Sequence, residues 1–116
     1  MGLRLSVRRS AWDAHVASVA ALPGIVPVVK GNGYGFGRPV LMPIAARLIA
    51  PSANIAVGTV YEAHDVPADR SPWVLTPHLA RLPADLPAHS VLTVGSIAHV
   101  AALCDRATAE QGWGGR

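Results

Sequence analysis

The sequence is poor in several residue types that particular kinds of protein require. Its single cysteine, Cys104, excludes an internal disulfide framework. Lysine also occurs once, at Lys30, beside nine arginines. Charged residues make up only 15% of the chain and hydrophobic residues 51%, a balance too apolar for a disordered protein. The composition therefore predicts a soluble globular chain.

Patterns typical of metal sites, hydrolases and nucleic-acid binders are also missing. No two of the five histidines have the i, i+4 spacing of a helical zinc site. No G-x-S-x-G stretch marks a nucleophilic serine. The net charge is +3, but the arginines are scattered and lack interleaved aromatic residues. We therefore expect no metal ion and no nucleic-acid partner.

Long apolar runs are absent as well. Residues 16–29 carry no charge, but two prolines and a glycine interrupt them, and the run is too short to cross a bilayer. An arginine pair near the start could open an export signal, yet Asp13 and His15 break the apolar region that would follow. The sequence predicts a cytoplasmic protein with no membrane partner.

The most informative stretch surrounds Lys30. Residues 24–29 form an apolar, valine-rich segment typical of a strand buried on both faces, and Lys30 stands at its carboxyl end. Alternating glycines follow up to Gly37, and they permit positive φ angles and close approach of a ligand. Pro39 then suits the start of a helix. The predicted unit is strand, glycine-rich turn and helix, with the sequence VVKGNGYGFG at its centre.

Spacing excludes two common phosphate-binding motifs from this turn. A P-loop places its lysine after the glycines, whereas Lys30 precedes them. The dinucleotide pattern G-x-G-x-x-G meets Phe36 or Arg38 at its last position. What remains is a lysine at a strand end, where a Schiff-base lysine of an α/β barrel is expected. The alternative interpretation is an ordinary lysine that reaches solvent.

The rest of the chain alternates strand and helix patterns. Strands are expected at residues 3–7, 24–30, 53–58, 72–76 and 90–94, and helices at 10–22, 39–50 and 96–106. Ser10 would cap the first helix, and Pro43 is tolerable only near the start of the second. Tyr61 and Glu62 would cap or line the end of the 53–58 strand, or else form a solvent-exposed helix start. Cys104 shares a helical face with apolar residues, which predicts a buried thiol rather than a reactive one.

The string around Lys30 resembles the pyridoxal phosphate (PLP) attachment motif of the alanine racemase family, usually written VVKANAYGHG. Residues 54–59, followed by Glu62 and Ala63, are similar to the family's second barrel strand and its Glu-Ala pair. The resemblance implies an α/β fold, about the first half of a (β/α)8 TIM-type barrel. That incomplete PLP-binding barrel domain would span residues 1–108, and residues 109–116 would form a loose tail.

The resemblance also implies roles for individual residues. Lys30 would form the Schiff base with PLP and act as one of two proton-transferring bases, while Tyr34 would help to hold the cofactor phosphate. Gly31 and Gly33 replace the commoner alanines, a change conservative in size, and Phe36 replaces the commoner histidine. The implied substrate is a small amino acid such as alanine, and the full-length family forms homodimers.

The family's second base is a tyrosine from a further, mostly β domain of the partner subunit, and nothing in this chain matches it. A complete barrel takes roughly 250 residues, whereas this chain has 116. We therefore expect an incomplete amino acid racemase that is inactive by itself. One alternative is a non-catalytic remnant or PLP-binding module that keeps the lysine. Another is a small open α/β domain that folds alone.

Overall fold

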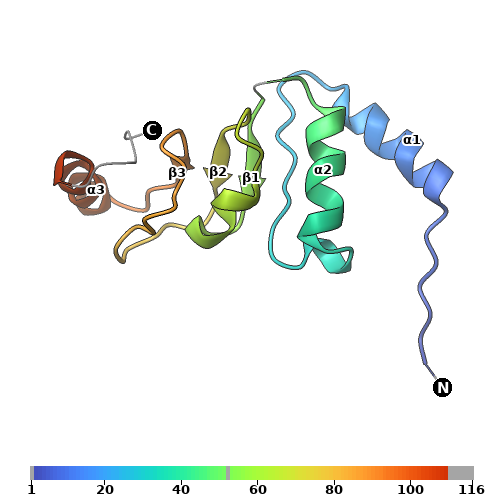
Figure 1. Ribbon diagram of the computed structural model, residues 1–116, viewed down its shortest axis with the longest axis horizontal. Coiled ribbons are helices and arrows are strands. Elements are labelled where there is room, and N and C mark those ends of the chain that lie inside the picture. The colour runs from blue at the N-terminus through green and yellow to red at the C-terminus, as the bar shows by residue number, and fades with distance from the viewer. Residues whose placement is uncertain (1, 52, 110–116) are drawn as a thin grey trace.

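The computed structural model describes residues 2–51 and 53–109. The elements follow one another in chain order across the molecule (Figure 1). The helices are α1 (Arg9–Ala20), α2 (Arg38–Leu48) and α3 (Ile97–Ala109), the short 3-10 helices are η1 (Gly33–Gly35) and η2 (Val60–Asp65), and the strands are β1 (Ile55–Val57), β2 (Pro72–Val74) and β3 (Val91–Leu92).

The strands form one parallel sheet in the order β1, β2, β3. Ile55 pairs with Pro72, and Trp73 with Val91. Residues 25–30 extend along the other side of β1, joined to it by a parallel bridge between Val28 and Ala56. The Val29 N–H donates to the Ala56 carbonyl at 2.8 Å. Each extended segment thus lies beside the next one in the chain, in an α/β arrangement.

The core is centred on β1 because this strand has neighbours on both sides. Ile55 and Val57 are completely buried, and Val74 of β2 is 1% exposed. Side chains from α2, η2 and the later loops pack around them, namely Met42, Val60, Ala63, Val66, Leu82 and Leu86. The best-packed part of the molecule therefore leads directly into Gly58, the residue that follows β1.

The outer elements are much less buried. No residue of α1 is buried, and Leu3 and Ile97 are almost fully exposed. The radius of gyration is 16.3 Å, against roughly 13 Å for a compact domain of this length. The elements spread out in a row (Figure 1) and do not enclose one another.

Several sequence predictions are confirmed with changed bounds. Strands form within the predicted ranges 53–58, 72–76 and 90–94, and helices cover most of 39–50 and 96–106. The range 24–30 is extended but makes only one bridge. The strand predicted at residues 3–7 is wrong, because the described residues before α1 form none. Leu3 and Leu5 remain exposed, since no neighbouring segment covers them.

Three smaller predictions also need correction. Ser10 lies inside α1, whose cap is Arg8, and it does not cap the helix. Pro43 lies in the interior of α2 and not in its first turn. Cys104 is exposed rather than buried, because α3 turns His99 and Leu103 inward instead. The His99 ring holds this orientation, since it bonds to the Gly95 N–H at 3.2 Å and to the His78 carbonyl at 2.9 Å.

Two predictions concern the ends of the chain and its relation to membranes. The predicted tail at 109–116 lies outside the described residues except for Ala109, the last residue of α3. No helix within residues 2–51 and 53–109 combines the length and the apolar character that crossing a membrane requires.

Candidate functional site

Lys30 lies at the carboxyl edge of the parallel sheet. The bridge between Val28 and Ala56 sets the register, and two residues further along Lys30 lies beside Gly58. A Cβ added to Gly58 would stand only 3.3 Å from the Lys30 Cβ. The Thr76 N–H donates to the Gly58 carbonyl at 2.9 Å, which brings β2 to the same edge. Lys30 is exposed there, at the edge where open α/β sheets bind ligands.

The glycine turn packs closely against the start of α2. The Gly33 N–H donates to the Lys30 carbonyl at 2.9 Å. Gly33 has a φ of +58°, and an added Cβ would stand 2.9 Å from the Arg38 nitrogen. Gly31 has a φ of +54° but has open space around it. The glycines are therefore not conservative replacements in this turn, because an alanine at position 33 would be both strained and obstructed.

Tyr34 lies in the same turn as Lys30, as the sequence predicted. It adopts a left-handed conformation with a φ of +54°, which costs a residue with a Cβ about 1–2 kcal/mol. Its side chain is largely exposed, at 64%. The structure therefore holds the phenol in a constrained turn and leaves it open to solvent.

Phe36, at the end of the glycine turn, contacts α1. Its ring and that of Trp12 have centroids 6.1 Å apart and are tilted by 39°. The aromatic pair joins the glycine turn to a helix that has no buried residue of its own. The apolar ring at this position thus has a packing role that an imidazole would fill less well.

A buried carboxylate, Glu62, holds the turn from the side of β1. Glu62 is 8% exposed, and one of its oxygens, Oε1, accepts the Gly31 N–H. The other oxygen, Oε2, accepts the Thr59 N–H at 2.7 Å and the Thr59 hydroxyl at 3.0 Å. Together with Thr59, Glu62 forms a capping box at the start of η2.

Arg38 completes this network from the first position of α2. Its Nη1 donates to the Gly31 carbonyl at 2.6 Å and lies 3.4 Å from Glu62 Oε1. Its Nε donates to Asp65 at 2.7 Å. The N–H and the C=O of Gly31, the residue directly after Lys30, are therefore both held by charged side chains.

The surroundings of Glu62 favour its ionised form. Burial acts to raise its pKa, but hydrogen bonds from Gly31 and Thr59, together with the charge of Arg38, outweigh burial. The net effect is a pKa below the ordinary value of 4.5. Glu62 is therefore a carboxylate at neutral pH, as its role as an acceptor requires.

This lowered pKa predicts a loss of stability in acid. Well above pH 4.5 the carboxylate is ionised in both the folded and the unfolded chain, so its stabilising contribution is complete. As the pH falls from there through the folded pKa, the unfolded chain binds the proton first and the contribution of Glu62 is lost. We expect urea unfolding to show a smaller acid-induced loss for Glu62→Gln than for the wild type. Equal losses would contradict this role.

The sequence pattern singled out Lys30 and Tyr34 as candidate site residues and gave no sign of the contacts that Glu62 and Arg38 make with Gly31. Tyr61 and Glu62 were predicted to cap or line the end of the 53–58 strand. Glu62 does lie at that end, in the capping box of η2, whereas Tyr61 is exposed. The available signal was the capping-box pattern that runs from Thr59 to Glu62. No local pattern relates Glu62 to Gly31, which lies 31 positions earlier.

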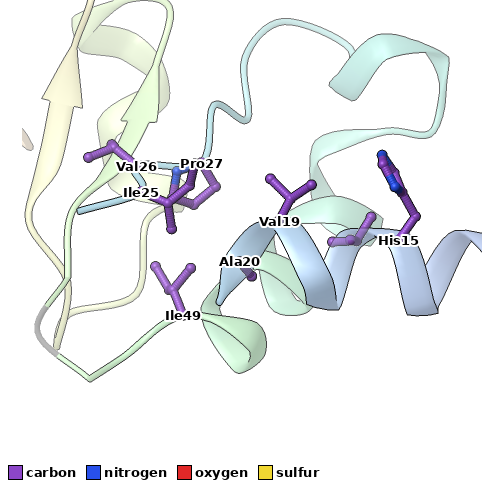
Figure 2. A pocket seen from close by; sticks show the side chains of 8 residues that line it. His15, Val19, Ala20, Ile25, Val26, Pro27 and Ile49 are labelled. Carbon is purple, nitrogen blue, oxygen red and sulfur yellow. The ribbon is translucent and has the colours of Figure 1, made fainter. Parts of the chain in front are cut away.

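A separate apolar cleft of about 370 Å³ lies between α1 and the start of the 25–30 segment (Figure 2). Its lining is almost entirely aliphatic apart from His15, and it includes neither Lys30 nor Tyr34. Within the described residues, no group of histidine, cysteine, aspartate and glutamate side chains could hold a metal ion. The candidate site is therefore the carboxyl edge around Lys30.

The chain was also compared with known proteins. No protein-family model matches it, and neither the curated proteins nor the solved structures include a match.

Proposed function

We propose that this chain binds PLP covalently through Lys30 and is an incomplete amino acid racemase of the alanine racemase kind, inactive by itself. The observation that carries the proposal is the exposed Lys30 amine at the carboxyl edge of parallel strands, within a glycine turn that resembles the alanine racemase motif. The parallel strands neighbour one another in the order in which they occur in the chain, as consecutive strands of a (β/α)8 barrel do. This order supports a partial barrel, which is part of the same proposal.

The residues around Lys30 fit a cofactor of this kind. A Cβ at Gly58 would approach the Cβ of Lys30 to 3.3 Å, so a glycine at this position lets the lysine stem lie directly against the end of β1. Tyr34 offers an exposed phenol from the same turn. Arg38 and Glu62 form an ion pair with each other, and Glu62 accepts a hydrogen bond from the turn. The charges of these two side chains are therefore engaged, and the amine of Lys30 is the group we assign to the reaction.

Each residue has a definite task in this chemistry. The Lys30 Nζ would hold the cofactor and would take or return a proton at the substrate Cα. The Tyr34 hydroxyl would hold the cofactor phosphate by a hydrogen bond. When bound, PLP supplies an electron sink for the negative charge that develops at Cα. Alanine as the substrate follows from the resemblance, and a cytoplasmic location follows from the sequence.

Reductive labelling tests the assignment of Lys30. After incubation with PLP and reduction with borohydride, we expect mass spectrometry to find the pyridoxyl group on Lys30, the only lysine of the chain. Lys30→Arg keeps the charge but removes the primary amine, so it should retain label on the terminal amine alone. A wild type that is labelled only at its amino terminus would contradict the proposal.

A PLP-binding module without turnover is the second candidate function. The exposure of both Lys30 and Tyr34 favours it, because an open site excludes water poorly. Racemisation also needs an acid on the opposite face of the substrate, which the resemblance assigns to another domain. An exchange assay with D- and L-alanine tests for turnover. We expect labelling without racemisation by this chain alone, and measurable racemisation would contradict both the binding module and the expectation of an incomplete enzyme.

A further inference from the structure

We propose that Glu62 is a positioning residue for Lys30, acting through the peptide group of Gly31. The inference rests on the proposed function, since it concerns how the cofactor lysine is held. Glu62 itself need not touch the cofactor. Its carboxylate links the end of β1 to the turn that carries the lysine.

The two oxygens of Glu62 have different partners. Oε2 accepts both the N–H and the hydroxyl of Thr59, three positions earlier, which completes the cap of η2. Oε1 is not needed for that cap. It accepts the N–H of Gly31, which belongs to a different extended segment. A carboxylate that only capped η2 would leave this second oxygen to solvent.

The peptide group of Gly31 is held on its other side as well. The Arg38 guanidinium donates to the Gly31 carbonyl at 2.6 Å and is oriented by Asp65 at 2.7 Å. Arg38 also lies 3.4 Å from Glu62 Oε1, so the two side chains support each other. Gly31 has open space around it and a positive φ, so packing alone does not fix its orientation. The charged pair therefore fixes the backbone directly after Lys30.

Gly58 brings this carboxylate close to the lysine stem. A Cβ added to Gly58 would stand 2.7 Å from Glu62 Oε2 and 3.3 Å from the Lys30 Cβ. The carboxylate and the lysine stem thus flank the same point at the end of β1. A shift of Glu62 would alter both the turn and the space beside the lysine.

The experiment compares the wild type with Glu62→Gln, which keeps the shape of the side chain but removes its charge and one acceptor oxygen. Asp13→Asn is the matched control, because it makes the same charge change at an exposed carboxylate of α1 whose ion-pair partner is Arg9. Thr59→Val loosens Glu62 by removing one of its donors, whereas Thr59→Ser retains the hydroxyl. Circular dichroism establishes that each variant is folded.

The first measurement is independent of PLP. In the wild type, we expect the amide proton resonance of Gly31 to follow the titration of the Glu62 carboxylate below pH 4.5. This titration should be absent in Glu62→Gln and unchanged in Asp13→Asn. A Gly31 resonance that is the same in the wild type and Glu62→Gln would overturn the inference.

The second measurement is the apparent Kd of PLP, read from the absorbance of the lysine adduct before reduction. Loss of a charge-assisted hydrogen bond should raise it on the order of tenfold in Glu62→Gln. A rise of about threefold is expected in Thr59→Val, which loses a weaker bond, and restoration in Thr59→Ser. Asp13→Asn should remain at the wild-type value.

The outcomes separate this inference from the proposed function. No adduct on Lys30 in the wild type would overturn the proposed function, while the Gly31 resonance would still test whether Glu62 holds the Gly31 peptide group. A wild type and a Glu62→Gln variant that bind PLP equally well through Lys30 would overturn the positioning role and leave the proposed function intact. If Glu62→Gln does not fold, Thr59→Val and Thr59→Ser decide the question, since equal Kd values for the two would contradict the inference.

Discussion

Replacing Gly33 with alanine should lower the free energy of unfolding by about 2–4 kcal/mol. The left-handed conformation, with a φ of +58°, strains any residue that has a Cβ. The new methyl would also stand 2.9 Å from the backbone nitrogen of Arg38, and the backbone cannot move aside as a flexible side chain can. Urea unfolding followed by circular dichroism measures the loss.

Gly31→Ala is the matched control for this prediction. Its φ of +54° is nearly the same, but the space around it is open, so only the conformational strain should remain, about 1–2 kcal/mol. The difference between the two variants isolates the obstruction by Arg38. If Gly33→Ala were tolerated as well as Gly31→Ala, the turn would have a different conformation, such as one that suits the alanines common in the racemase motif.

The second large effect is expected in the core. Ile55→Ala should lower the free energy of unfolding by about 2–5 kcal/mol, because Ile55 is completely buried in β1 and its removal leaves a cavity. Native domains have only about 5–15 kcal/mol in total, so much of the chain's stability would be lost. Chemical denaturation at neutral pH provides the measurement.

Ile97→Ala makes the same chemical change in an exposed position. Ile97 is 89% exposed at the start of α3, so its replacement should change stability by less than about 0.5 kcal/mol. Similar losses in the two isoleucine variants would show that β1 is not the centre of the core. The comparison also bears on the site, because β1 leads into Gly58 and the Glu62 cap.

The sequence was most informative where the structure depends on neighbouring residues. The apolar runs predicted the parallel strands, and the spacing of Lys30 and the glycines predicted the turn, because both patterns are local. The alternation of Leu3 and Leu5 was misleading, since a strand also requires a partner that a pattern cannot supply. The inward face of α3 depends on the bonds of His99 to His78 and Gly95, and so the exposure of Cys104 could not be foreseen.

The charged network was hidden from the sequence for a related reason. Arg38 and Glu62 are each ordinary residues at the start of a helical element, and only the fold brings them to the two sides of Gly31. Their meeting depends on the bridge between Val28 and Ala56, which sets the register of the lysine segment against β1. A prediction of the site therefore requires the register as well as the motif.

The order of the sheet has a consequence for how the chain acquires its structure. Every extended segment pairs with the one that follows it in the sequence, from residues 25–30 through β1 and β2 to β3. During synthesis, which proceeds from the amino terminus, each new strand therefore finds its partner already outside the ribosome. The lysine turn can close as soon as η2 has emerged, before β2 and β3 leave the ribosome.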